Sequence, residues 1–156
     1  NGSGLSVVDA YNTSLTRTIE TNLSVGRMRL AATTVGNYAL FGGGYSGNSN
    51  NCYATVDAYD TSLTRTTPKV LSVARYYLAA TSVGECAVFG GGDPNTGMYS
   101  SVYDVYDTSL TRTTLSHTAT WGMERHAATT VGNYALFGGG NSNDDVTTRV
   151  HALTVA

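Results

Sequence analysis

The chain has 156 residues, which is long enough for one domain with a hydrophobic core. Its net charge of −2 argues against a nucleic-acid-binding protein, because phosphate binding needs a concentrated basic surface. Charged residues make up only 13% of the sequence, about half the usual share, and threonine, serine, asparagine, glycine and tyrosine take their place.

The first predicted elements are two short strands within residues 5–19, followed by a complete set of four strands within residues 29–67. The dipeptide Gly36-Asn37 separates the first two strands of this set and is typical of a tight hairpin turn. No helical periodicity occurs in this stretch. We name the four strands A to D in chain order, and they span residues 30–35, 38–41, 54–59 and 64–67.

Two further copies of this arrangement follow. A second set of four strands is predicted within residues 77–115, and strands A to C of a third within residues 126–155. Each strand B ends at a glycine triplet, and the triplets at 42–44, 90–92 and 138–140 are evenly spaced. We call this spacing the repeat interval; a period near 50 residues built from short strands indicates a propeller-type array. We therefore expect one all-β domain over residues 1–156, with 13 strands in about three blade-equivalents of four-stranded antiparallel meanders.

Three sequence elements of the repeats resemble the kelch-repeat family. They are the strand ALFGGG, the strand VDAYD, and an arginine ahead of strand A, which is Arg27 or Arg75 and, displaced by a one-residue insertion, Arg125. The chain is similar in this respect to the central kelch-type repeats of galactose-oxidase-like proteins. The resemblance implies a β-propeller of four-stranded blades. The tryptophan that the family carries in strand D is replaced by threonine, at Thr18, Thr66 and Thr113.

Three blade-equivalents cannot circle an axis, because propellers close with four to eight blades. One explanation is that two identical chains form a single six-bladed ring, in which the C-terminal strands A to C accept strand D from the N-terminus of the partner. The extra strand C within residues 5–11 is unexplained in that arrangement. The other explanation is that the chain is part of a longer propeller. Because it begins at Asn1 without a methionine, we expect a processed product or a piece of a longer protein.

Motifs for catalysis, metal binding or cofactor binding are weak. The segment GGGYSG at 42–47 matches a phosphate-binding loop, but no helix follows it. His117, His126 and His151 lack the spacing of metal ligands. We therefore predict no catalytic residue, no cofactor and no metal. We also expect free thiols at the two cysteines, Cys52 and Cys86, which fall at opposite ends of neighbouring blades.

A carboxylate recurs just before the tyrosine of strand C. We interpret it as structural, because buried carboxylates usually satisfy nearby backbone donors. A ring of catalytic carboxylates is the alternative. The residues concerned are Asp9, Asp57 and Asp104.

The loops differ between the copies at only one end of the predicted blades. The A–B and C–D turns share one end and are nearly identical, whereas the B–C and D–A loops share the other end and vary in length and chemistry. Loops on a rigid scaffold often carry binding residues, so we predict a binding face at the variable end. Two alternatives stay open: the loops merely tolerate change, and the sole tryptophan plugs a groove between blades. The candidate binding residues are Tyr45, Asn50, Tyr76, Tyr77, Tyr99, Trp121 and Arg125.

The composition and the variable loops together favour a non-catalytic binding module outside a bacterial cell or on a virion surface, recognising protein or glycan. A purely structural repeat whose main partner is itself is a second hypothesis, and a fragment of a carbohydrate-active or oxidase-type enzyme is a third. We expect no nucleic-acid partner, and no membrane span, because no apolar run approaches the roughly 20 residues that a span needs.

Overall fold

The computed structural model describes residues 4–47, 51–116, 121–142 and 145–155, which contain fifteen strands and no helix. The all-β prediction is therefore confirmed. The two strands beyond the thirteen predicted are β11 (Met123–Glu124) and β14 (Asn141–Ser142), which have two residues each and pair with one another. Short pairings of this kind between two loops leave no periodic signal in the sequence.

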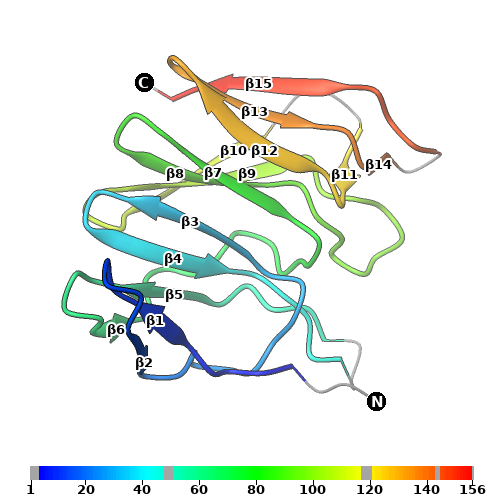
Figure 1. Ribbon diagram of the computed structural model, residues 1–156. Coiled ribbons are helices and arrows are strands. Elements are labelled where there is room, and N and C mark those ends of the chain that lie inside the picture. The colour runs from blue at the N-terminus through cyan, green and yellow to red at the C-terminus, as the bar shows by residue number, and fades with distance from the viewer. Residues whose placement is uncertain (1–3, 48–50, 117–120, 143–144, 156) are drawn as a thin grey trace.

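Three antiparallel sheets follow one another along the chain and stack face to face (Figure 1). The first sheet has the order β3 (Ala31–Val35), β4 (Tyr38–Gly42), β5 (Val56–Tyr59), β6 (Arg65–Thr66). The second has the order β7 (Ala79–Val83), β8 (Cys86–Gly90), β9 (Val102–Asp107), β10 (Arg112–Ser116). The third has the order β12 (Ala127–Val131), β13 (Tyr134–Gly138), β15 (Val150–Thr154). An N-terminal ribbon of β1 (Asp9–Tyr11) and β2 (Arg17–Ile19) lies below the first sheet.

Strand β7 packs between β3 and β12, so the strand A positions of the three sheets lie side by side. The hairpin turns have the predicted two residues, with Gly36 in the left-handed region at φ 50°. The other turn of the first sheet depends on Asp60, whose Oδ1 accepts hydrogen bonds from the backbone N–H of Ser62 and of Thr64, each at 2.9 Å. Asn12 and Asp107 make the same bonds in their own turns, which explains why an Asx residue precedes each Thr-Ser-Leu-Thr block.

The sheets pack through a repeated contact between phenylalanine and glycine. A Cβ built on Gly42 would lie 2.8 Å from Cε1 of Phe89, and one built on Gly90 would lie 2.9 Å from Cε1 of Phe137. Both phenylalanines are fully buried. The glycine that ends strand B of one sheet therefore makes room for the phenylalanine of the next sheet, so the glycine triplet is a packing feature.

Buried ion pairs connect strand C to the linker that precedes strand A. Arg27 lies 2.8 Å from Asp57, and Arg75 lies 2.9 Å from Asp104; all four side chains are fully buried. The backbone N–H of Ser24 also donates to the Asp57 carboxylate. This confirms the structural interpretation of Asp57 and Asp104.

The third sheet lacks this ion pair. Met123 lies one repeat interval after Arg75 and so takes the position of the buried arginines. His151 takes the position of the buried aspartates, because it pairs with Phe137 as Asp57 pairs with Phe41. The prediction that Arg125 is the displaced third arginine is therefore wrong, because Arg125 takes the repeat position of Arg29 and Tyr77. The reason is that the inserted residue lies before Met123, so the register from there to the glycines is unchanged.

His126 is a buried histidine at a position where the other copies have leucine. Its side chain is 9% exposed and both ring nitrogens are buried without a well-formed hydrogen bond. Burial lowers the pKa of His126 to about 4, and the nearby Gly90 backbone opposes this only in part. The unfolded chain binds this proton near pH 6.5, whereas the folded chain does not until about pH 4. Protonation therefore favours unfolding within that window.

We expect the free energy of unfolding to fall by up to about 1.4 kcal/mol per pH unit between pH 6.5 and 4 on account of this group. Replacing His126 by leucine removes the titrating group and keeps the apolar volume. Urea denaturation of both chains at pH 7.5 and pH 5 checks this, because all other titrating groups are shared. Equal losses in the two chains would contradict the assignment.

Candidate binding site: a tyrosine–arginine cluster

The variable loops of neighbouring sheets meet at one end of the stack. Isolated β-bridges join Met28 to Tyr45 and Tyr76 to Asp93, so each linker before strand A pairs with the loop that follows strand B. At the opposite end, a Cβ on Gly36 would lie 3.0 Å from Cγ2 of Thr108, which places an A–B turn beside a C–D turn of the next sheet. The loops are therefore distributed between the two ends as the strand order requires.

A backbone ladder crosses the sheets at the variable end. Arg29, Tyr77 and Arg125 have φ values of 60°, 55° and 53°, in the left-handed region that non-glycine residues rarely adopt. The N–H of Tyr77 donates to the carbonyl of Arg29 at 3.0 Å, and the N–H of Arg125 donates to that of Tyr77 at 2.9 Å. These hydrogen bonds fix the three residues side by side, one per sheet, just before strand A.

Aromatic rings and guanidinium groups gather around this ladder. The Tyr76 ring lies 5.0 Å from the Tyr45 ring and 4.9 Å from the Tyr77 ring. The Arg29 guanidinium lies over all three rings, at 5.4 Å from Tyr45, 5.7 Å from Tyr76 and 4.7 Å from Tyr77. On the other side, the Arg125 guanidinium lies 4.2 Å from the Tyr77 ring. We call these five residues the tyrosine–arginine cluster; both arginines are exposed and the tyrosines are half-buried.

Two carboxylates orient the cluster. The Tyr76 hydroxyl donates to Oδ2 of Asp93 at 2.7 Å, and burial followed by this bond raises the pKa of Tyr76. Arg125 Nε lies 3.4 Å from Oε1 of Glu124, whose charge raises the pKa of Arg125. Burial, and then Glu124, also raise the pKa of Tyr99. The hydroxyls of Tyr76 and Tyr99 are therefore neutral at physiological pH.

Of the remaining candidate residues, Tyr99 lies beside Glu124 at the border of the cluster. Trp121 is 40% exposed, and the Arg149 guanidinium lies 4.6 Å from its ring. A side chain that plugs a groove between sheets is buried, so this exposure does not fit the plug hypothesis. Asn50 and His117 lie outside the described residues.

Sequence reasoning missed Arg29, Asp93 and Glu124 as members of the site. The signal for Arg29 was present, because it precedes Tyr77 by one repeat interval, as Tyr77 precedes Arg125. Arg27, two residues before Arg29, does not belong to this site. Arg27 is buried because its charge is paired with Asp57 inside the stack.

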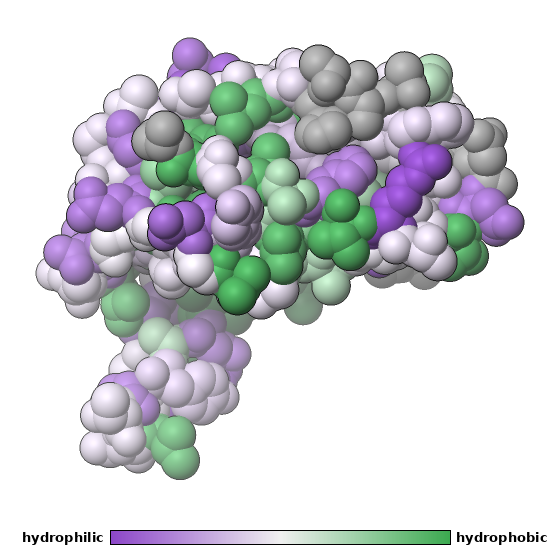
Figure 2. Space-filling view, turned by 90° about the horizontal axis from the view of Figure 1, so that it is seen from above, coloured by the Kyte–Doolittle hydropathy of each residue, from purple (hydrophilic) through white to green (hydrophobic). Residues whose placement is uncertain are grey.

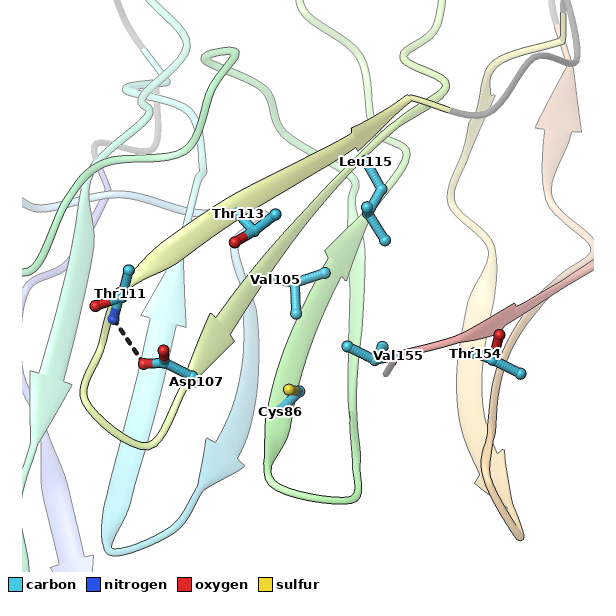
Figure 3. A pocket seen from close by; sticks show the side chains of 8 residues that line it. All are labelled: Cys86, Val105, Asp107, Thr111, Thr113, Leu115, Thr154 and Val155. Atoms are coloured by element: carbon cyan, nitrogen blue, oxygen red, sulfur yellow. Dashed lines mark hydrogen bonds between the residues drawn. The ribbon is translucent and has the colours of Figure 1, made fainter.

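A cavity of about 430 Å³ lies between the second sheet and the end of β15 (Figure 3). The Asp107 carboxylate in its lining is already engaged, because it accepts a hydrogen bond from the Thr111 N–H at 2.9 Å. Cys86 is a free thiol, and burial raises its pKa, which disfavours the reactive thiolate. The cavity therefore offers space without an activated nucleophile. It is lined by Cys86, Val105, Asp107, Thr111, Thr113, Leu115, Thr154 and Val155.

Within the described ranges, no three or more histidine, cysteine or acidic side chains come together as metal ligands would. The same residues include no helix that is long and apolar enough to cross a bilayer. The chain matches no protein-family model and no curated protein.

Proposed function

We propose that the chain is a non-catalytic binding module built from kelch-like propeller blades, displayed outside a bacterial cell or on a virion, which recognises a protein or a glycan. The observation that carries this proposal is the tyrosine–arginine cluster. Five residues from three linkers and a loop converge at the one end of the stack where the internal copies differ. A shared scaffold with one variable end is the usual arrangement of a binding surface.

The chemistry of the cluster supports recognition rather than catalysis. Tyrosine and arginine provide large, semi-rigid contact area and are enriched among residues that dominate binding energy. The half-buried phenol rings contribute aromatic contact area, and the exposed Arg29 and Arg125 provide charged donors. Asp93 and Glu124 hold Tyr76 and Arg125 in place, so little side-chain entropy is lost when a ligand binds.

The test of this proposal is a screen on arrays of glycans and of bacterial surface proteins. We expect at least one specific signal. It should be abolished in the triple variant Tyr76→Ala, Tyr77→Ala, Trp121→Ala, and retained in the control Tyr134→Ala, which removes a tyrosine that is 51% exposed at the opposite end. A signal that survives the triple substitution would reject this face as the site.

The single variant Trp121→Ala distinguishes a binding role of this side chain from a packing role. Because its side chain is 40% exposed, we expect Trp121→Ala to lower the free energy of unfolding by less than about 1 kcal/mol. Its effect on affinity for an array ligand should be larger, about tenfold or more. A stability loss of about 3 kcal/mol, the usual cost of removing a buried tryptophan, would restore the plug hypothesis.

Self-association is a second candidate function, which the two open ends of the stack favour. The first sheet borders a cavity of about 360 Å³ lined by Leu30, Ala31, Ala32 and Phe41 with the N-terminal segment. At the other end, the third sheet presents an apolar hollow that includes Leu136 and Val150. Figure 2, which looks down on the third sheet, shows hydrophobic side chains gathered on this face. Open apolar faces and unpaired sheet edges favour association.

Light scattering tests this second function. We expect a species of at least twice the chain mass of 16.4 kDa, in equilibrium with the single chain on dilution. A species of 16.4 kDa at every concentration up to the millimolar range would contradict it.

A further inference from the structure

Two strands of the chain occupy the same position of the repeat. Strand β15 pairs with β13 in the register by which β5 pairs with β4: His151 lies opposite Phe137 as Asp57 lies opposite Phe41. Strand β1 carries Asp9, which precedes Asp57 by one repeat interval. Both β1 and β15 are therefore strand C of a sheet.

The N-terminal segment accepts backbone hydrogen bonds from the linker before the first sheet, just as the first sheet accepts them from the linker before the second. The N–H of Leu23 donates to the carbonyl of Ser6 at 2.8 Å, and one repeat interval later Leu71 donates to Ala54 at 2.8 Å. Arg27 likewise donates to Leu5 at 3.1 Å, as Arg75 donates to Tyr53 at 3.2 Å. The ribbon thus lies where strands C and D of a preceding sheet belong, and the cavity beside Phe41 is the place of that sheet's strands A and B.

The third sheet offers the strands that fit this place. Between the first two sheets, the glycines after strand B contact the next sheet, since a Cβ on Gly43 would lie 2.9 Å from Leu78 and one on Gly42 would lie 2.8 Å from Phe89. At Gly139 a Cβ would meet nothing within 4 Å. The hairpin β12–β13 is therefore complementary to the face that carries Leu30 and Phe41, the repeat counterparts of Leu78 and Phe89.

Strand β15 makes one buried hydrogen bond to the second sheet, between His151 Nδ1 and the Tyr103 hydroxyl at 2.7 Å, but it lacks the tyrosine of the other C strands. In the other sheets a tyrosine of strand C bonds to the linker that leads into its sheet. The hydroxyls of Tyr59 and Tyr106 donate to the carbonyls of Thr21 and Lys69, each at 2.7 Å. Leu153 stands at this position in β15, opposite Ala135 as Tyr106 is opposite Ala87. It packs against the buried hydrophobic cluster that contains Val105, and the cavity of about 430 Å³ is lined by Val105, Leu115 and Cys86.

Strand β1 carries the tyrosine that β15 lacks, together with an aspartate that is already paired with Arg17. Its sequence Asp9-Ala10-Tyr11 equals that of Asp57-Ala58-Tyr59 in β5. Tyr11 is 64% exposed in the single chain, so the side chain that fills this position in the other sheets is present but unburied.

We propose that two copies of this chain associate by strand exchange, in which β1–β2 of each copy replaces β15 on β13 of the other and Tyr11 enters the cavity beside Val105. This inference rests on the self-association proposed above. Each copy then contributes β1–β2, two complete sheets and β12–β13, so every sheet has four strands and the ring closes with six. Strand β15 serves the single chain only, as a cover for the edge of β13.

Engineered disulfides test the exchange, in a Cys52→Ser, Cys86→Ser background. Leu136 lies opposite Ala152 in the single chain, and the exchange places Ala10 of the other copy there, as Ala58 lies opposite Leu40. Opposed residues of antiparallel strands have Cα atoms about 4.5–5.5 Å apart, within disulfide range. The variant Ala10→Cys, Leu136→Cys should form a covalent dimer on oxidation. The variant Leu136→Cys, Ala152→Cys should lock β15 in place, and so remain a single chain until it is reduced.

The outcomes separate the two levels of the proposal. If the chain dimerises but the first variant forms no interchain disulfide and the second dimerises while oxidised, exchange is wrong and self-association stands. If the parent chain remains a single chain at all concentrations, both are wrong. Circular dichroism of each variant confirms that it retains the sheet structure of the parent.

A second measurement uses point variants of the ribbon. Tyr11→Ala should raise the dimer dissociation constant about a hundredfold, because a buried tyrosine at an interface is a typical dominant contact. The control Ile19→Ala removes another exposed side chain of the ribbon, one that is 67% exposed and whose repeat counterparts Thr67 and Thr114 are also exposed. It should change the constant by less than about threefold. Equal effects of the two substitutions would overturn the assignment of Tyr11 to the cavity.

Discussion

Replacing Asp104 by alanine is expected to lower the free energy of unfolding by about 3–5 kcal/mol. The reason is that Arg75 lies 2.9 Å away with no exposed surface, so the substitution leaves a buried guanidinium without its counter-charge. It also removes the acceptor for the Ser72 N–H. Burial already lowers the pKa of Arg75, which shows that its environment opposes the charge that Asp104 stabilises.

The chain provides its own control at the same repeat position. Asp9 pairs with Arg17 at 2.8 Å, but both side chains are exposed, so Asp9→Ala should cost less than about 1 kcal/mol. The double variant Arg75→Met, Asp104→His, which copies Met123 and His151 of the third sheet, should recover part of the loss. Urea denaturation in dilute solution measures all three. Equal losses for Asp104→Ala and Asp9→Ala would show that burial of the pair does not determine its contribution.

Replacing Gly91 by valine should destabilise the chain by about 4 kcal/mol or more, because strain and overpacking act together. Gly91 has φ 64°, and a Cβ would lie 2.6 Å from the Met123 carbonyl and against the His126 ring. Gly139 has φ 74° with nothing within 4 Å of its Cβ position, so Gly139→Val should cost only the backbone term of about 1–2 kcal/mol.

The difference between these two variants measures the crowding between sheets. Thermal or urea denaturation of dilute single chains gives both values. A Gly91→Val chain whose stability matches that of Gly139→Val would contradict the packing role of the glycine triplet. Both glycines have positive φ, so the backbone strain of a valine is common to the two variants. The remaining difference in stability therefore reports the close approach of the next sheet.

Local sequence determined most of the sheets. Gly36-Asn37 and its counterparts fix the two-residue turns, and the alternation around Asp57 and Tyr59 identifies strand C, because turn chemistry and side-chain alternation act over a few residues. The repeat interval then gave the position of each residue of strands A and B within its sheet. The face on which the variable loops gather followed from strand order alone.

The sequence did not predict which side chains and strands contact one another. Arg27 and Arg29 are close neighbours in the chain, yet Arg27 is buried with Asp57 while Arg29 lies over Tyr77 in the solvent. Strand periodicity places both on one side of the chain, and only the packing of the next sheet decides between them. Strand β15 lacks the aspartate and tyrosine of the pattern and still pairs with β13, because a free sheet edge accepts a strand of suitable length with little regard to its side chains.

The phenylalanine–glycine contact and the arginine–aspartate pair also affect how the gene for such a chain can change. Each interface between sheets is made by residues at fixed positions of the repeat, so removal or duplication of one full repeat, such as 27–74, rejoins a phenylalanine to a glycine and an arginine to an aspartate. Recombination between the nearly identical segments can therefore alter the number of sheets without creating a mismatched interface. The loops at the variable end are carried along with each unit, so a change in array length is at the same time a reshuffling of the exposed surface.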